Sequence, residues 1–252
     1  MTEPPAFNFP KTQQRVFEKN YLESAVVELR FPTLLRLGQG EPISLQDVLR
    51  SQFPNYQPNT QFQMTAKGTT GEKSVYQFAT RSQDTVLEIT SSTISLQARK
   101  YTSFENLIGH LEFVVDQCVP LLDTDFFTRI GIRFINKVAG FKTNGMDISD
   151  WINSDLTKPI GVDGLGSIAH MHSQVTGSCG QDNFYLFQYG LSPESSDGRV
   201  FVLDWDYYRQ DVDVPSCVDY MKYFHEQHRD FFWWSLGPKA QEALENGTAS
   251  RT

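Results

Sequence analysis

The segment at residues 126–138, FFTRIGIRFINKV, constrains more than any other what this chain can fold into. Its side chains alternate as in a β-strand, with Ile130 and Ile132 on one side and Arg133 on the other. The sequence VVELRF at 26–31 carries the same apolar-Arg-Phe ending earlier in the chain. We therefore predict that each half of the chain opens with the same central strand.

The pattern that follows each central strand predicts the rest of the fold. A short helix, an antiparallel meander of strands and a long amphipathic helix are expected in each half, with the long helices at 104–119 and 217–234. Ser103 is the expected N-cap of the first long helix, and Pro120 its expected end. The prediction is an α+β fold of two tandem units related by pseudo-twofold symmetry. The expected parts are an extended N-terminal arm at 1–20, a first unit at 21–122, a second unit at 123–236 packed on the first as one globular body, and a C-terminal tail at 237–252 that is disordered from residue 246.

Composition argues against several classes of protein. The chain has 252 residues and a net charge of −8, which provides no basic field for non-specific nucleic-acid binding. Its cysteines, Cys118, Cys179 and Cys217, form no CxxC pair, as is typical of reduced thiols in a cytoplasmic protein. No stretch approaches 18 consecutive apolar residues, and the first residues lack the pattern of a signal peptide. A cytoplasmic protein without a membrane segment is expected.

Four histidines could in principle bind zinc. His170 and His172 share a face of a strand predicted at 168–176, and His225 and His228 share a face of the second long helix. The favoured alternative is that the helical pair are core histidines with satisfied nitrogens, because both fall on the apolar stripe of that helix. The HExxH motif of a metalloprotease is absent. We predict no metal site and no cofactor.

Two acidic residues of the LDWD segment are the other candidates for chemistry. Asp204 and Asp206 share one strand face, and paired carboxylates can bind a metal ion or act as acid and base. No phosphate loop or further carboxylate accompanies them, so a solvated strand face or an ion pair with Arg133 is favoured. The sequence therefore predicts a protein that is not an enzyme.

Two arginines occupy equivalent positions in the two halves. Arg30 and Arg133 each end an alternating apolar segment, so they could grip an anionic ligand in a cleft between the units. The favoured alternative is a structural ion pair in each half, with Glu28 or a strand neighbour as the partner.

An aromatic run on the second long helix gives the clearest indication of a binding surface. Four consecutive residues cannot all lie on one side of a helix, so part of the run must meet another surface. That surface could be the N-terminal arm, whose Phe7, Phe9 and Phe17 are available to dock, or a second subunit, or a partner protein. The residues of the run are Phe231, Phe232, Trp233 and Trp234.

Several segments together resemble a sporadically distributed family of uncharacterised bacterial proteins. Its middle strand reads like RIGLRYIN, and this chain has Phe134 where that family has tyrosine. The resemblance implies the fold and a cytoplasmic location, and the patchy distribution of the family indicates accessory genes such as defence or toxin-related clusters. The segments that carry it are VVELRF at 26–31, YTSF at 101–104, RIGIRFIN at 129–136, VFVLDWD at 200–206 and FHEQHRDFF at 224–232.

Three functions follow, in order of preference. The first is a non-catalytic binding or adaptor protein that acts through protein–protein contacts, in a bacterial defence or toxin-neutralising system. Its partner would be a protein, a basic one if the acidic second half is used, or a second copy in a homodimer. The second is a sensor that holds a small anionic ligand such as a nucleotide between Arg30 and Arg133. The third is a metal-dependent nuclease or hydrolase that uses Asp204, Asp206 and the histidines.

Overall fold

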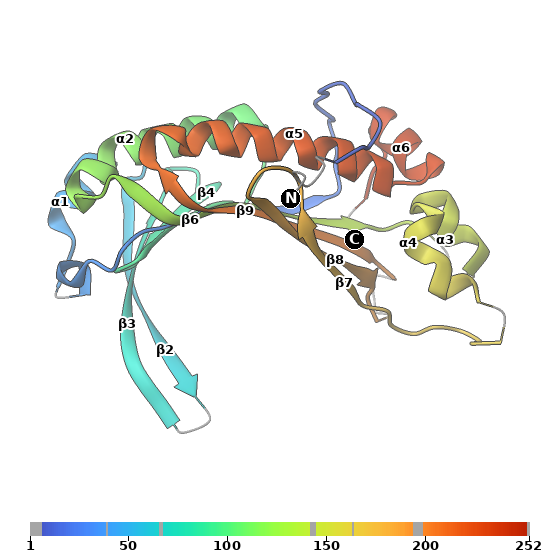
Figure 1. Ribbon diagram of the computed structural model, residues 1–252, viewed down its shortest axis with the longest axis horizontal. Coiled ribbons are helices and arrows are strands. Elements are labelled where there is room, and N and C mark those ends of the chain that lie inside the picture. Colours follow the sequence, from blue (N-terminus) through green and yellow to red (C-terminus); the bar gives the residue numbers. More distant parts are fainter. Residues whose placement is uncertain are drawn as a thin grey trace. The chain divides into compact units, whose positions relative to one another are not determined.

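The computed structural model describes residues 7–38, 40–65, 68–141, 145–162, 164–193 and 199–250. Within these ranges the chain forms nine β-strands and six α-helices, which confirms the α+β prediction (Figure 1). The strands belong to one sheet in the order β2-β3-β4-β5-β1-β6-β9-β8-β7. Neighbouring strands run antiparallel in the pairs β1–β5, β2–β3, β3–β4, β4–β5 and β7–β8.

The elements have the following bounds. The strands are β1 (Leu22–Arg30), β2 (Asn55–Thr65), β3 (Gly68–Ala79), β4 (Thr85–Ile89), β5 (Thr93–Ala98), β6 (Phe126–Val138), β7 (Ser173–Ser178), β8 (Asn183–Leu191) and β9 (Phe201–Asp213). The α-helices are α1 (Ile43–Leu49), α2 (Phe104–Leu122), α3 (Gly145–Trp151), α4 (Ser154–Thr157), α5 (Cys217–Ser235) and α6 (Pro238–Glu245). Short 3-10 turns lie at Leu35–Gly38, Lys158–Gly161 and Val214–Ser216.

The chain folds into two compact units, each assembled from distant parts of the sequence. The terminal unit, which contains both chain ends, comprises Met1–Glu23, Arg133–Tyr207 and Tyr223–Thr252. The hairpin unit, which contains the β2–β3 hairpin, comprises Ser24–Ile132 and Tyr208–Lys222.

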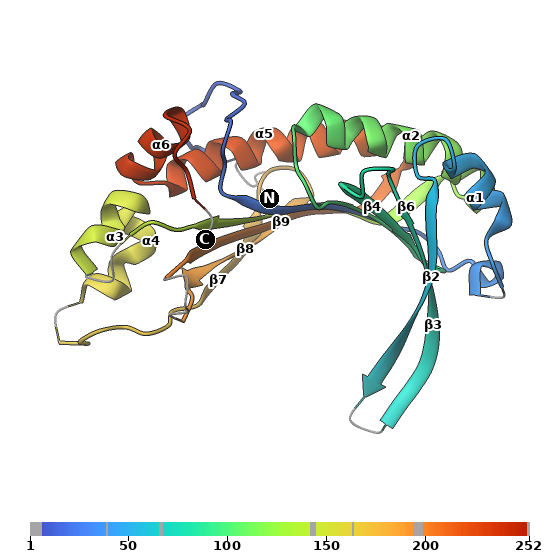
Figure 2. The same ribbon diagram turned by 180° about the vertical axis from the view of Figure 1, so that it is seen from behind.

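The hairpin unit buries one face of its strands beneath α2 (Figure 2). In β5, Ile94 and Leu96 are fully buried whereas Ser95 and Gln97 are half-buried, which confirms the predicted alternation. The apolar stripe of α2 is buried as well, because residues at helical spacing share one face. Its most buried members are Leu107, Leu111, Val114 and Cys118.

The ends of α2 test two local predictions. The Ser103 side chain accepts a hydrogen bond from the Asn106 N–H at 3.2 Å, which confirms the N-cap. The prediction that Pro120 ends the helix is wrong, because α2 continues to Leu122 and ends at Asp123 in the left-handed region with φ of 53°. A proline in the last turn removes one hydrogen bond only, and the helix has enough buried surface to tolerate that loss.

The C-terminal tail of the terminal unit is ordered through residue 250. Ala249 is 6% exposed, and the Ser250 carbonyl accepts a hydrogen bond from the Ala139 N–H at 3.2 Å. A turn at Gly247, with φ of +65°, directs the chain back after α6. The predicted disorder is therefore wrong for residues 246–250, and residues 251–252 lie outside the described part of the chain. Among the helices of the described residues, none is both long and apolar enough to cross a membrane.

Candidate functional site

An extended N-terminal arm, residues 7–19, contains neither strand nor helix and lies beside α5 and α6 (Figure 1). Its phenylalanine rings pack on the aromatic run of α5. Phe9 stacks on Phe231 with a centroid distance of 4.4 Å, and Phe17 lies nearly parallel to Trp233 at 6.2 Å. Of the surfaces that the aromatic run was expected to meet, the described residues therefore place the arm against it.

The first ring of the arm reaches further than the other two. Phe7 contacts Phe231 at 5.2 Å, but also Tyr185 of β8 at 4.8 Å and Tyr207 of β9 at 6.3 Å. Edge-to-face geometry prevails in these contacts, as is favourable for aromatic pairs. The arm is thereby joined to the strands under α5 as well as to the helix.

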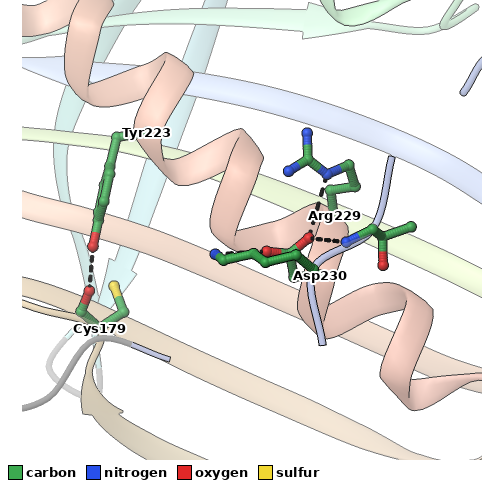
Figure 3. Close-up of polar contacts among 6 residues, drawn as sticks. Cys179, Tyr223, Arg229 and Asp230 are labelled. Carbon is green, nitrogen blue, oxygen red and sulfur yellow. Dashed lines mark hydrogen bonds and ion pairs between the residues drawn. The ribbon is translucent and has the colours of Figure 1, made fainter. Parts of the chain in front are cut away.

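A buried carboxylate of α5 fixes the middle of the arm. Asp230 is 2% exposed, and its two oxygens accept hydrogen bonds from Lys11 Nζ at 2.9 Å and from the Thr12 N–H at 3.0 Å. Arg229, the neighbour of Asp230 on the helix, donates from Nε at 3.4 Å (Figure 3). Two of the three groups that donate hydrogen bonds to this carboxylate therefore come from the arm.

The protonation of Asp230 reflects these partners. Burial by itself raises the pKa of the carboxyl group, but the hydrogen bonds from Lys11 and Thr12 and the positive charges of Lys11 and Arg229 outweigh it. The net result is a pKa below the ordinary value of an aspartate. Asp230 is therefore ionised at neutral pH, and its charge depends on the arm for compensation.

Further contacts hold the arm near its end. Arg15 pairs with Glu245 of α6 at 2.5 Å, and its guanidinium carbon lies 5.8 Å from the Trp233 ring centroid. Both members of this ion pair are about half exposed, so it stabilises the contact less than the buried carboxylate does. We call the surface that holds the arm the arm seat; it consists of Tyr185, Tyr207, Asp230, Phe231, Trp233, Trp234 and Glu245.

The aromatic run divides between two directions. Phe232 turns its ring toward Trp205 at 6.1 Å and His228 at 5.8 Å, in the core. Phe231 and Trp234 meet the arm through Phe9, at 4.4 and 5.0 Å, and Phe231 also contacts Trp205 of the core at 5.5 Å. The division follows from helical geometry, and a role of the run in binding a partner protein stays a prediction.

Arg133 forms a structural ion pair in the terminal unit. Its Nε and Nη2 donate to the two oxygens of Asp204 at 2.8 and 2.6 Å. These hydrogen bonds raise the pKa of Arg133 above its ordinary value, despite partial burial. The predicted ion pair is confirmed, and a role of Arg133 in binding a ligand stays a prediction.

Arg30 forms the corresponding ion pair in the hairpin unit. Its Nε donates to Glu28 at 2.7 Å, and Glu28 also accepts from Arg129 at 3.1 Å. Arg30, Glu28 and Glu88 line a pocket of about 410 Å³ with polar walls. Two carboxylates beside one lining arginine give this pocket little attraction for an anion. The other lining residues are Val75, Thr90, Ser92, Thr93 and Ser95.

The two histidines at 170 and 172 do not lie on a strand, so that prediction is wrong. The Met171 N–H donates to the Leu191 carbonyl at 3.1 Å, but strand β7 begins only at Ser173. The backbone of Met171 lies so close to Gly190 that any side chain there would collide with it. This close approach keeps residues 170–172 out of the regular hydrogen-bond ladder between β7 and β8, and position 190 requires glycine.

The same segment forms a small pocket in the terminal unit. His170, His172 and Asp204 line a pocket of about 210 Å³, together with apolar side chains. His170 Nδ1 lies 2.9 Å from the Leu191 carbonyl, and Asp204 is occupied by Arg133. Among the described residues, no group of three His, Cys, Asp or Glu side chains could hold a metal ion.

His228 is a core residue, as predicted, but its nitrogens are not both satisfied. It is 7% exposed and stacks on Phe134 at 4.1 Å with an angle of 9°. Within the described residues its Nδ1 has no hydrogen-bond partner. Burial, and to a lesser degree the nearby His225, lowers its pKa well below 6.5, so the imidazole is neutral.

The cysteines are poor nucleophiles. Cys118, Cys179 and Cys217 are all fully buried. Burial raises the pKa of Cys118 and Cys179 to about 12 and that of Cys217 to about 11. Because the thiolate is the reactive form, these thiols are unreactive at neutral pH. Cys179 contributes a structural contact instead, since Tyr223 points toward it and donates to its carbonyl at 2.6 Å (Figure 3).

No protein-family model matches the chain, and no curated protein sequence matches it. Function is therefore inferred from the contacts of the described residues. The best-defined recognition geometry among those contacts is the arm seat. Its central residue, Asp230, was not singled out by sequence reasoning, although an acidic residue directly before the aromatic run (HRDFFWW) was the signal.

Proposed function

We propose that the protein is a non-catalytic binding or adaptor protein that acts through protein–protein contacts, with the arm seat as its binding surface. The observation that carries this proposal is the contact of the arm with α5, in which an extended segment is held by aromatic rings and a buried carboxylate. Protein interfaces concentrate their binding energy in such aromatic and charged residues. Extended peptides are commonly recognised through alternate side chains in this way.

The chemistry of the other candidate residues favours binding over catalysis. The pocket at His170 and His172 contains a carboxylate that Arg133 already neutralises. The cysteines are protonated at neutral pH. A sensor that holds an anion between Arg30 and Arg133 has less support, because each arginine is engaged with a carboxylate.

The architecture supports a tandem repeat. We infer that 21–122 and 123–236 are two α+β units related by pseudo-twofold symmetry, because strand, helix, meander and long helix recur in the same order. The sheet order adds support, since β1 and β6 are neighbours and β5 and β9 flank them. Membership of the bacterial family with the RIGLRYIN-like strand, a cytoplasmic location and a role in defence belong to the same proposal.

A capture experiment in extracts of the native host tests the function. The full chain would be compared with a Trp233→Ala/Trp234→Ala variant and with Tyr220→Ala, a control on the same helix whose ring contacts Arg209 instead of the arm. We expect one stoichiometric protein partner with the wild type and the control, and its loss with the double variant. Equal capture by all three folded proteins, or capture by none, would contradict the proposal.

A further inference from the structure

We propose that the arm seat recognises an extended segment of a partner protein with the order aromatic-x-aromatic-x-lysine, and that the chain's own arm is the occupant which this segment displaces. The inference rests on the proposed function and specifies the chemistry of the partner. The arm itself displays the order, as Phe7-Asn8-Phe9-Pro10-Lys11. The seat therefore already holds one ligand of this class.

The spacing of the two rings follows from an extended backbone. Residues i and i+2 of an extended chain lie on the same side, roughly 6.5–7 Å apart. Phe7 and Phe9 both reach Phe231, at 5.2 and 4.4 Å, and their own centroids are 5.3 Å apart. Pro10 restricts Phe9 to an extended conformation and thus keeps this arrangement. A peptide with one aromatic residue, or with two adjacent ones, would leave part of the seat unfilled.

The buried carboxylate requires a cation two residues after the second ring. Asp230 is 2% exposed, and on its own helix it has Arg229 at 3.4 Å as a charged donor. When the arm leaves, the carboxylate loses Lys11 and the Thr12 N–H. A new occupant without a cation there would leave a desolvated charge poorly compensated, which is strongly unfavourable. An acidic residue at that position would be excluded.

The arm is attached in a way that permits exchange. Residues 7–19 contribute to no strand or helix, so their release breaks no sheet ladder. Phe7, Phe9 and Phe17 are only half-buried, and Lys11 remains 72% exposed in its side chain. A tethered occupant nevertheless has a high effective concentration, on the order of millimolar. A partner segment must therefore bind the seat more tightly than the free arm sequence does, unless the contact between the arm and the seat has been weakened.

A binding experiment with the full chain tests the inference. The probe is a fluorescein-labelled peptide of residues 7–17, FNFPKTQQRVF, and the readout is fluorescence anisotropy. The wild type is compared with a Phe9→Ser/Lys11→Ser variant, whose own arm competes less. We expect the peptide to bind the variant at least about tenfold more tightly than the wild type. The weakened arm leaves the seat empty in a larger fraction of the molecules, and only an empty seat can bind the peptide.

Two further changes test the chemistry of the seat. Within the arm-weakened chain, a peptide with glutamate in place of its lysine should bind about tenfold more weakly, a difference of about 1.4 kcal/mol. Adding Asp230→Asn should abolish that discrimination, whereas Glu226→Gln, which removes an exposed carboxylate from the same helix, should preserve it. Equal binding of the two peptides to the arm-weakened chain would overturn the inference.

Other outcomes are equally decisive. If the arm-weakened variant does not fold, hydrogen exchange of residues 7–17 in the wild type should rise with excess unlabelled peptide, and no change would overturn the inference. A concentration-dependent dimer that Phe9→Ser/Lys11→Ser abolishes would overturn it in favour of arm exchange with a second copy. Host capture that depends on Trp233 and Trp234, without peptide binding, leaves the proposed function standing and this inference wrong. Peptide binding without host capture would contradict the proposed function and with it the partner segment, and would leave only the contact between the chain's own arm and its seat.

Discussion

Two aspartates of the terminal unit have similar chemistry but different consequences. Asp204 of β9 is 8% exposed and accepts two hydrogen bonds from Arg133 on β6. Asp230 of α5 is 2% exposed and accepts hydrogen bonds from Lys11 and Thr12 of the arm. Asp204 thus joins two strands that are already neighbours in the sheet. Asp230 joins the helix to a segment that no regular hydrogen-bond ladder holds.

The difference shows that the role of an ion pair depends on what else connects its partners. Loss of the Asp204 pair leaves β6 and β9 in place, because the sheet still aligns them. Loss of the Asp230 pair leaves the arm with its aromatic contacts and one half-exposed ion pair. The buried carboxylate then has to be solvated, which is easiest if the arm moves away.

The largest effect is expected from removing the rings that seat the arm. Phe7→Ala/Phe9→Ala should lower the free energy of unfolding by about 3 kcal/mol, since two half-buried rings and their aromatic contacts are lost. Chemical denaturation followed by tryptophan fluorescence measures the change. Val16→Ala, at a side chain that is 75% exposed, should change stability by less than about 0.5 kcal/mol. A double variant as stable as this control would show that the arm is not seated.

The next effect compares the two aspartates directly. Asp230→Asn should cost about 2 kcal/mol at pH 7, and Asp204→Asn about 1 kcal/mol because Arg133 is 47% exposed in its side chain. The pKa of Asp230 is lowered in the folded protein, so its stabilisation is complete above about pH 4 and is lost as pH falls through the folded pKa. The stability difference between wild type and Asp230→Asn should shrink in that acidic range. Equal costs for the two substitutions would show that the two aspartates stabilise the protein to the same extent.

His228 sharpens the comparison, because it is a buried titratable group without a charged partner. Its pKa is lowered well below 6.5, so only the unfolded chain gains a proton as pH falls below that value. Stability is therefore complete above about pH 6.5 and should fall by up to about 1.4 kcal/mol per pH unit below it. His228→Phe, which keeps a ring against Phe134, should remove this slope, whereas His172→Gln at an exposed site should keep it. Thermal melts between pH 7 and pH 5 provide the test.

The smallest effects are expected at the two arginines. Arg30→Ala should cost about 0.5 kcal/mol or less, since its side chain is about half exposed and so is only weakly paired with Glu28. Arg133→Ala should cost about 1 kcal/mol, because the arginine is half exposed but the Asp204 carboxylate that it leaves is buried. A double-mutant cycle of Arg133→Ala and Asp204→Asn should give a coupling energy below about 1 kcal/mol. A cost above 2 kcal/mol at either arginine would indicate that these two ion pairs contribute as much to stability as the arm seat does.

The sequence predicted correctly those strands and helices whose periodic pattern of apolar residues extends over many positions. β6 spans the whole predicted segment. Its apolar and polar side chains alternate over the full length, so only one pairing register with the neighbouring strands buries the apolar face. The ion pair of Arg133 with Asp204 was foreseen as well, since both lie on strands with a defined face. The segment at 168–172 was predicted as strand from a short alternation, which could not reveal the close approach of Met171 to Gly190.

The arm seat was only half predictable. The aromatic run and the phenylalanines of the arm indicated a contact, because large rings need a partner surface. The pairing of Lys11 with Asp230 joins residues far apart in the chain, and the arm has no periodicity that would fix its register. Such a pair is determined by tertiary packing, which a local pattern does not encode.

Amide hydrogen exchange of the arm tests the central claim most directly. Exchange of the segment 7–17 would be followed at neutral pH in the wild type, in Asp230→Asn and in the control Glu226→Gln. We expect protection of the arm in the wild type and in the control, centred on the Thr12 amide that donates to Asp230, and its loss in Asp230→Asn. Exchange of the wild-type arm at the rate of an unstructured peptide, or undiminished protection in Asp230→Asn, would contradict the claim that the buried carboxylate holds the arm on α5.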